Sequence, residues 1–308
     1  MVRIIGDIQA EGRLSWQGAV EALRAGHLRE RAQIGDMFLG PGTQTLLTRA
    51  AYIPGLGFGV KAFTVFDENA AKGLPTVQGG MMVYEPDSGS LGAVIEVPLV
   101  TAYKTAADSL LGASILARPD SRRLLIVGAG TLAGNLARAY AALFPGLERI
   151  AIWARRPEQA RALVAELDLA RAEVAGDLAD EVAQADIIST ATMARSPVIR
   201  GDWVRPGTHI DLIGAYKADM READDALIAK GRLFVDSRET TIHHIGELMI
   251  PLAAGVISEN DVLGDLYDLV GGQPGRRTAD EITLFKNGGG AHLDLMTAAY
   301  IMQAVSGA

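Results

Sequence analysis

The chain has 308 residues, 37 acidic and 29 basic side chains that give a formal charge of −8, and no cysteine. The lack of cysteine excludes disulfides, thiolate nucleophiles, iron–sulfur clusters and cysteine zinc sites. The acidic balance indicates that nucleic acid is not a partner, because a nucleic-acid surface needs excess positive charge. The first residues lack a long apolar core and no run of about 18 apolar residues follows, so we expect no signal peptide, no membrane segment and a cytoplasmic location.

The first part of the chain is predicted to combine helices with a sheet. Apolar side chains near helical spacing predict that the first 30 residues are helical, and an apolar face predicts another helix over 101–116. Over 36–96, short β-like runs are separated by turns that contain glycine and proline. Strands joined by tight turns indicate an antiparallel or mixed sheet.

From residue 121 the pattern changes to alternating strands and helices. Strands are predicted at 123–130, 149–154, 172–175, 186–192, 208–215 and 232–237. Helices are predicted at 132–144, 157–168, 178–185 and 222–231. Strands that are apolar throughout are typical of a parallel sheet covered by helices on both faces, so we predict a doubly wound α/β domain.

The end of the chain is predicted to leave this alternation. From about Thr241 we expect helix and loop, and then, over 282–305, a strand or turn that runs into a helix. We place the domain boundaries near 120 and 285, because a last helix that returns to the first domain gives two complete domains. The first then comprises 1–120 and 285–308, and the second comprises 121–284.

A glycine-rich loop carries the strongest chemical signal. Gly128-Ala129-Gly130-Thr131-Leu132-Ala133-Gly134 follows a predicted strand and opens a predicted helix, which is the context of the dinucleotide fingerprint. Gly128 permits the tight turn, Gly130 leaves room for a pyrophosphate at the backbone, and Ala133 lets the helix pack on the sheet. The amides at the helix start, including those of Thr131 and Leu132, then face the phosphates. The alternative is a structural glycine turn.

The end of the next strand bears on which dinucleotide binds. A carboxylate about 20 residues after the glycines would hold the ribose 2′-hydroxyl of NAD. The sequence here reads Ala154-Arg155-Arg156, and two guanidinium groups match a phosphate dianion. We therefore expect NADP(H) to be preferred, with NAD(H) as the second choice. The alternative is that both arginines are solvated loop residues, one of which stacks on the adenosine.

Small side chains end two later strands of the same domain. Ala191, Thr192 and Met193 end one of them, and Ile213 ends the other. Ligands of such sheets bind outside the carboxyl ends of the strands, so we expect these residues to line the nicotinamide side. Plain core packing is the alternative.

Segments spread over almost the whole chain carry a family resemblance. They are Val60-Lys61, 73–78, 99–107, the glycine loop, 206–211, 234–237 and 283–286. In this order they resemble the ornithine cyclodeaminase/μ-crystallin family. The resemblance implies a Rossmann domain with a doubly wound parallel sheet and a second, α+β domain that is built from both chain ends, binds substrate and forms a homodimer.

Four departures from the family pattern bear on the activity. Cyclodeaminases carry a catalytic aspartate at the strand end where this chain has Ala215, so true ornithine cyclodeamination is not expected. The usual family arginine is Lys104 here, which keeps the charge but not the bidentate geometry. An early substrate-binding arginine has no clear counterpart, and Arg49 is the residue that can replace it. The family's Ser-His pair is Thr76-Val77, which removes one polar group near the cofactor.

The resemblance and the arginine loop together imply an NADPH-dependent enzyme. It would transfer a hydride to the C=N carbon of a 2-imino acid, such as Δ1-pyrroline-2-carboxylate or Δ1-piperideine-2-carboxylate, and so take a small imino or amino acid as its partner. Two alternatives stay open. One is an amino-acid dehydrogenase that works oxidatively with NAD, and the other is a non-catalytic, NADPH-dependent binding protein.

Three basic residues are predicted to contact substrate or cofactor. The substrate carboxylate needs a fixed cation, for which we expect Lys61, with Arg49 as a second; an exposed strand lysine is the alternative. By resemblance, Lys104 reaches the cofactor or the substrate, with a solvated helix lysine as the alternative, and Thr76 and Asn287 lie near the cofactor.

The remaining polar residues have weaker signals. His244 falls where crystallin-like members carry a substrate-facing acid, and its ordinary pKa near 6.5 suits proton donation. It is equally a structural histidine, because no acid is required if the substrate enters as the iminium. His243-His244-x-x-Glu247 lacks the spacing of a zinc site, so no metal is expected. Asp294 is expected to cap a helix or to form an ion pair.

Overall fold

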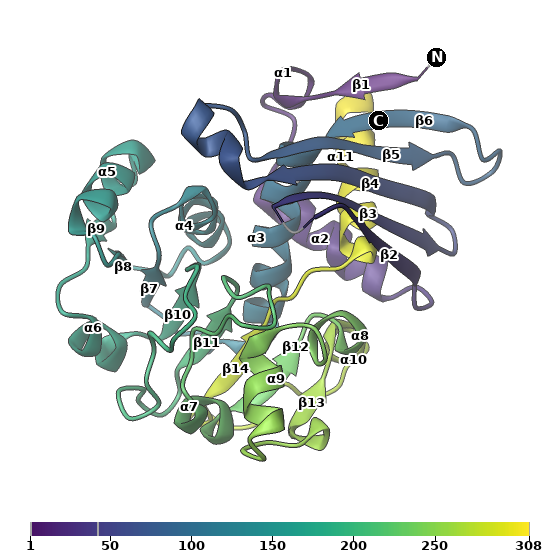
Figure 1. Cartoon of the computed structure of the whole chain (residues 1–308). Coiled ribbons are helices and arrows are strands. Elements are labelled where there is room, and N and C mark those ends of the chain that lie inside the picture. Colours follow the sequence, from purple (N-terminus) through teal and green to yellow (C-terminus); the bar gives the residue numbers. More distant parts are fainter. Residues whose placement is uncertain (1, 42, 308) are drawn as a thin grey trace. The chain divides into compact units, whose positions relative to one another are not determined.

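The computed structural model describes residues 2–41 and 43–307, and the chain divides into two compact units (Figure 1). The first unit comprises Met1–Ala107 and Gly290–Ala308, and the second comprises Asp108–Gly289. One division falls inside the helix α3 (Val97–Leu116), whereas the sequence placed it near 120, after that helix. The other follows Gly289, close to the boundary expected near 285.

The first unit contains a mixed sheet with the strand order β1-β6-β5-β4-β3-β2. Its strands are β1 (Arg3–Ile5), β2 (Gln33–Leu39), β3 (Gln44–Ile53), β4 (Gly57–Phe66), β5 (Val77–Tyr84) and β6 (Leu91–Glu96). Neighbours from β2 to β6 are antiparallel, and β1 pairs with β6 in parallel. The prediction that the first 30 residues are helical is therefore wrong at Arg3–Ile5. These three residues become a strand only because β6, far along the chain, offers them a partner.

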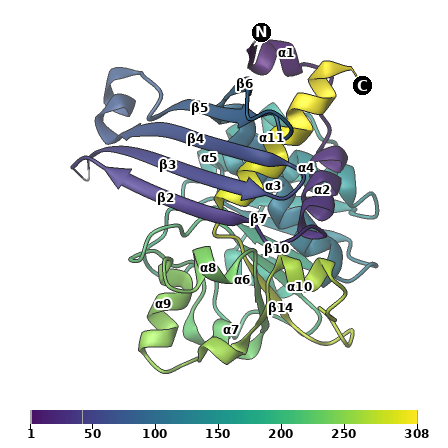
Figure 2. The same cartoon turned by 90° about the vertical axis from the view of Figure 1, so that its right-hand side faces the viewer.

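Helices cover one face of this sheet. The helices of this unit are α1 (Asp7–Ala10), α2 (Trp16–His27), the first part of α3, a 3-10 helix at Asp67–Lys72, and α11 (Ala291–Ser306). The last helix, α11, packs against α2 and against β3 and β4 (Figures 1 and 2). Gly59 permits this approach, since a Cβ there would lie 2.8 Å from Cδ1 of Leu295. Strand β4 and helix α11, from opposite parts of the sequence, thus share one core.

The second unit contains a parallel sheet, as predicted. Among the described residues its strands run in the order β13-β12-β14-β11-β10-β7-β8-β9. They are β7 (Arg123–Val127), β8 (Arg149–Trp153), β9 (Ala172–Val174), β10 (Ile187–Thr190), β11 (His209–Leu212), β12 (Arg232–Val235), β13 (Val262–Gly264) and β14 (Thr283–Lys286). All pairs are parallel, and the central strands are buried on both faces, which explains their continuous apolar sequences.

The helices of the second unit connect these strands. They are α4 (Thr131–Leu143), α5 (Pro157–Leu167), α6 (Leu178–Gln184), α7 (Asp225–Lys230), α8 (Arg238–Thr241), α9 (Gly246–Ala253) and α10 (Leu266–Val270). The chain runs outward from β7 through β8 to β9, and then returns to β10 on the other side of β7. The order therefore reverses between β7 and β10, and ligands of such sheets bind at the carboxyl ends of the strands at this point.

Candidate functional site

The loop after β7 forms a tight turn at the point where the strand order reverses. Gly128 has φ +133°, a backbone conformation that favours glycine. A Cβ at Gly128 would lie 2.5 Å from the carbonyl oxygen of Ala191, and its amide donates to the carbonyl of Trp153 (2.8 Å). The turn is thus fitted closely against the ends of β8 and β10.

The start of α4 is open in the way that a bound phosphate requires. Gly130 is the N-cap of α4 and offers no side chain to cap the helix. A Cβ built on Gly130 would meet no atom within 4 Å, although its φ of −92° is ordinary. Backbone amides and the positive end of the helix dipole therefore face free space, and the residues present fit the pyrophosphate of a dinucleotide. Ala133 is fully buried, as its packing role predicts.

Two arginines stand at the end of β8. Arg155 and Arg156 are exposed, and neither forms an ion pair within the described residues. Ala154, which precedes them, is half-buried. No carboxylate occupies the position that would hold a ribose 2′-hydroxyl, so this strand end is uniformly basic.

The ends of β10 and β11 are held by a carboxylate that the sequence reasoning did not select. Glu222 is 0% exposed, and its Oε1 accepts hydrogen bonds from the amide (2.7 Å) and hydroxyl (2.6 Å) of Thr192. Its Oε2 accepts from the Thr190 hydroxyl and the Gly214 amide, both at 2.7 Å. The hydroxyl proton of Thr192 is therefore committed to the protein, so this residue shapes the edge of the site through its backbone.

The other residues predicted at this edge differ in exposure. Met193 is 66% exposed and Ala191 is half-buried, whereas Ile213 is buried and its amide donates to the carbonyl of Thr190 (3.1 Å). Ala215, which stands where cyclodeaminases carry an aspartate, is fully buried against Met220 and Ile245.

Two more buried charges support Glu222. The carboxylate of Glu247 accepts hydrogen bonds from the amides of Glu222 (2.7 Å) and Ala223 (2.8 Å). Burial raises the pKa of Glu247 to about 7; nearby Lys286 opposes this shift. Lys286 on β14 is also fully buried, and its Nζ donates to the carbonyls of Leu212 (2.9 Å) and Ala215 (2.8 Å). Charged residues are rarely this buried, so their side chains alone gave no signal of this role.

The loop after β14 is fixed by Asp236. Its carboxylate accepts from the amides of Gly288 (2.8 Å) and Gly289, and from the hydroxyl of Thr241 (2.7 Å). The side-chain amide of Asn287 donates to the hydroxyl of Ser109 (2.9 Å). Asn287, predicted near the nicotinamide, thus lies in a loop whose backbone is rigidly positioned.

The residues predicted to bind substrate meet in the first unit. Lys61 on β4 is buried, and its Nζ lies 2.7 Å from Oδ1 of Asp294 on α11, which is the ion pair expected for Asp294. Burial lowers the pKa of Lys61; Asp294 opposes the shift, and the positive charges of Lys104 and Arg49 add to it. Arg49 pairs with Asp36 (2.9 Å). Three cations and two carboxylates leave this cluster with one excess positive charge, which suits a small monocarboxylate.

Three further predicted residues show less specific surroundings. Lys104 on α3 is buried, at 7% exposure. Thr76 is half-buried in the turn before β5, and its carbonyl accepts from the amide of Phe66 (2.9 Å). His244 is exposed, and its ring forms no hydrogen bond in the described part of the chain. Its neighbour His243 pairs with Glu259 (3.2 Å).

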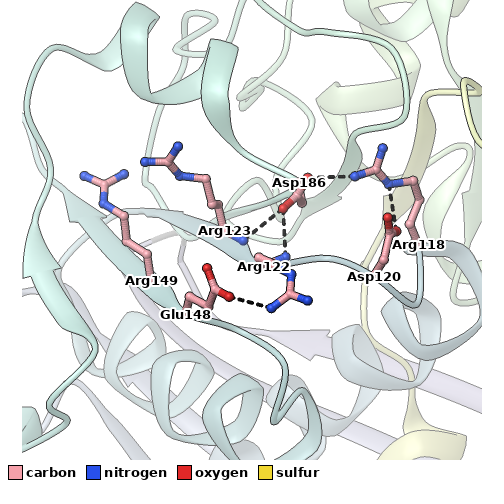
Figure 3. Close-up of a pocket in the computed structure, with 7 residues that line it drawn as sticks. All are labelled: Arg118, Asp120, Arg122, Arg123, Glu148, Arg149 and Asp186. Carbon is pink, nitrogen blue, oxygen red and sulfur yellow. Dashed lines mark hydrogen bonds and ion pairs between the residues drawn. The ribbon is translucent and has the colours of Figure 1, made fainter.

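A cavity of about 560 Å³ lies at the opposite edge of the parallel sheet, where β7 and β8 begin (Figure 3). Its charged lining consists of Arg118, Asp120, Arg122, Arg123, Glu148, Arg149 and Asp186. Most of these groups already satisfy one another: Asp186 accepts from Arg118 (2.9 Å) and from two backbone amides, and Glu148 pairs with Arg122. This ion-pair network lies at the amino ends of the strands, whereas such sheets bind ligands at the carboxyl ends.

Residues 2–41 and 43–307 lack two features that would point to other functions. No group of three or more histidine, aspartate or glutamate side chains is arranged to hold a metal ion. No helix in this range is both long and apolar enough to cross a membrane.

Comparisons with known proteins identify a family and several similar proteins. Residues 45–308 match the model of the ornithine cyclodeaminase/mu-crystallin family. The chain is 65% identical over 303 residues to Delta(1)-pyrroline-2-carboxylate reductase of Paracoccus denitrificans (strain Pd 1222), covering 97% of this chain and 95% of the relative. The solved Delta(1)-pyrroline-2-carboxylate reductase of Thermococcus litoralis, in complex with NADH and L-proline, is 28% identical with a TM-score of 0.91, covering 99% of this chain and 98% of that one. An archaeal alanine dehydrogenase dimer with bound NAD is 28% identical with a TM-score of 0.90, covering 99% and 96%.

Proposed function

Because the chain belongs to the ornithine cyclodeaminase/mu-crystallin family, we propose that it is a nicotinamide-dependent reductase of Δ1-pyrroline-2-carboxylate and related cyclic 2-imino acids. The observation that carries this proposal is the 65% identity, over 97% of the chain, to a relative of that name. The reaction adds a hydride to the imine carbon and a proton to the nitrogen, so the C=N bond becomes CH–NH and the product is the amino acid.

The second unit holds the cofactor in this proposal. When bound, the reduced nicotinamide supplies the hydride, which carries both electrons. Gly128 and Gly130 let the backbone approach the pyrophosphate, and the amides of Thr131 and Leu132 bind it at the helix start. Arg155 and Arg156 support a preference for NADP(H), because exposed guanidinium groups that pair with no acid of the described residues can bind a 2′-phosphate.

The first unit holds the substrate carboxylate in this proposal. The Lys61 ammonium gives one N–H to Asp294 and keeps two donors for an incoming carboxylate. Lys104 and Arg49 add positive charge nearby, which offsets the repulsion between Asp294 and the substrate anion. The main contribution of these residues is to orient an already electrophilic imine.

Proton delivery involves either the substrate itself or His244. An iminium substrate brings its own proton, whereas the imidazole of His244 is exposed to solvent and is a candidate donor. The variant His244→Gln separates the two routes. A kcat that falls in the variant assigns the proton to His244, whereas an unchanged kcat assigns it to the iminium.

We also propose that the chain forms a homodimer through the sheet of the first unit. Four large apolar side chains are exposed on one face of β2 to β4, as their cross-strand register shows: Met37, Leu39, Leu46 and Phe58. Strand β2 is exposed along nearly all of its length, and a patch of this kind on a soluble surface marks an interaction site. The archaeal alanine dehydrogenase that this chain resembles is itself a dimer.

The activity is tested by following NADPH absorbance with Δ1-pyrroline-2-carboxylate and Δ1-piperideine-2-carboxylate, and by following NAD⁺ reduction with proline and alanine. We expect oxidation of NADPH with at least one ketimine and no ammonia release from ornithine, since Ala215 replaces the cyclodeaminase aspartate. NAD⁺ reduction with alanine that is faster than NADPH oxidation with either ketimine would favour the alternative function, an amino-acid dehydrogenase. The second solved structure is an alanine dehydrogenase. Saturable NADPH binding without any turnover would favour the binding protein.

A further inference from the structure

The buried carboxylate of Glu222 lies at the ends of β10 and β11, on one side of the point where the strand order reverses. In a sheet of this order the first half, β7 to β9, takes the adenosine, and the strands on the other side of the reversal take the nicotinamide. Arg155 and Arg156 belong to the first half. The hydrogen bonds that the Glu222 carboxylate accepts from described residues all come from the second half, at the ends of β10 and β11.

All four bonds to Glu222 come from donors, two to each oxygen. Oε1 serves Thr192, which follows β10, and Oε2 serves Thr190 and Gly214, so one carboxylate ties the two strand ends together. The fit between these loops is close, because a Cβ on Gly214 would lie 2.0 Å from the carbonyl oxygen of Thr192. Glu222 therefore bridges two loops at a place where a side chain on Gly214 would not fit.

The support behind Glu222 comes from two other elements. Glu247 at the start of α9 holds the backbone amide of Glu222, and Lys286 on β14 binds the carbonyls on either side of Gly214 and Ile213. Burying three charges is costly and is seldom the most stable way to fill a core. Such a network is better explained by a need for one fixed geometry at this edge than by stability alone.

We propose that Glu222 is a positioning residue that sets the nicotinamide half of the cofactor site by fixing the distance between the ends of β10 and β11. The inference rests on the proposed function only in requiring that a nicotinamide dinucleotide binds. It assigns no contact between Glu222 and the cofactor, because the carboxylate is fully buried and all of its bonds go to the protein.

The variant Glu222→Gln tests this assignment. In either orientation of the glutamine amide, its NH₂ group replaces one carboxylate oxygen and faces two hydrogen-bond donors. Either Thr192, or Thr190 together with Gly214, then loses its acceptor. We compare dissociation constants for NADPH and for 2′-phospho-ADP-ribose, which lacks the nicotinamide; NADH and ADP-ribose form a second pair. We expect NADPH to bind about 10-fold more weakly while the fragment keeps its affinity within about two-fold. The variant Glu181→Gln, which loses a glutamate bound to Arg149 at the far edge, is the matched control and should change neither value.

Equal weakening of NADPH and of the fragment would overturn the proposal, as would no weakening of either. If Glu222→Gln does not fold, Thr190→Val and Thr192→Val each remove one hydroxyl donor and leave the carboxylate in place. Each should weaken the binding of NADPH selectively, by a smaller factor.

Failure of the proposed function gives a different result. A wild-type chain that binds NADPH more tightly than the fragment but reduces no imine loses its assigned reaction and keeps the role of Glu222. A wild-type chain that binds no dinucleotide loses both.

Discussion

Lys61, which we propose binds the substrate carboxylate, is a buried charge with a single carboxylate partner among the described residues. Desolvation lowers the pKa of its ammonium, and the carboxylate of Asp294 on another element counteracts this. The Coulombic influence of Lys104 and Arg49 keeps the cluster from being neutralised by its own acids. A cation held in this way loses little on exchanging water for a substrate carboxylate, because burial has already removed most of its hydration.

Replacing Lys61 should change both the affinity for substrate and its pH dependence. We expect Lys61→Met to lower kcat/KM for Δ1-pyrroline-2-carboxylate by about 100-fold, since a charge-assisted contact is lost. Because burial lowers the pKa of Lys61, the wild-type KM should rise at a pH below the ordinary lysine value of about 10.5 as the ammonium loses its proton. Lys61→Arg should not show this alkaline rise, since guanidinium stays charged. Lys72→Met, at an exposed position of the same unit, is the control.

The arginines after β8 give a prediction about cofactor choice. Replacing Arg155 and Arg156 by alanine should raise the KM for NADPH about 10- to 100-fold, because two charge-assisted contacts to the 2′-phosphate disappear. The KM for NADH should hardly change. Arg161→Ala, an exposed arginine on the following helix, serves as the control. A wild-type enzyme that prefers NADH, or a double variant that loses both cofactors equally, would reject the assignment of these arginines.

At the scale of elements, the turn between β7 and α4 contains two glycines with different expected roles. Gly130 is expected to matter for cofactor binding, and Gly128 for folding. Gly130→Leu should leave the thermal unfolding temperature nearly unchanged, since its φ is ordinary and nothing lies within 4 Å. It should abolish NADPH binding, because the side chain would fill the space of the pyrophosphate. Gly128→Ala should instead destabilise the fold by about 1–3 kcal/mol through its positive φ and its contact with Ala191. Scanning calorimetry and NADPH titration measure the two effects. Binding that survives in Gly130→Leu would contradict this location of the phosphates.

The sequence predicted those elements whose residues carry a local signal. The apolar runs of β7, β8, β10, β11 and β12 and the glycine loop were identified because each is continuous in the chain. Strand β1 was missed, since three residues have no periodicity of their own and pair only with β6. Strand β13, in a stretch expected to be helix and loop, is equally short and is defined by its pairing with β12.

The buried polar network of the second unit was missed for a related reason. Glu222 meets Thr190 from 32 positions away, and Lys286 meets Leu212 from 74 positions away. Nothing in a single sequence distinguishes such residues from solvated ones, because charge normally indicates exposure. The expected roles of Lys61 and Lys104 came from the family resemblance, and the partner of Lys61 is visible only in the structure.

For the whole molecule, the apolar sheet face predicts the oligomeric state. We expect the wild-type chain to be a homodimer in solution, and the double variant Leu46→Asp with Phe58→Asp to be a folded monomer, because charge placed in a buried apolar interface is strongly disfavoured. Light scattering coupled to size-exclusion chromatography gives the mass. Circular dichroism checks that the variant is folded. A wild-type chain that is monomeric at micromolar concentration, or a dimer that the variant leaves intact, would locate the interface elsewhere.

The account as a whole depends on hydride transfer from a nicotinamide to the carbon of an imine. Its most direct measurement is the reduction of Δ1-pyrroline-2-carboxylate with NADPH deuterated at the transferable C4 position, followed by mass spectrometry of the product. We predict proline that carries one deuterium at C2, formed in equal amount to the NADPH consumed. A folded, NADPH-bound enzyme that yields no proline, or proline without the label, would contradict the central claim.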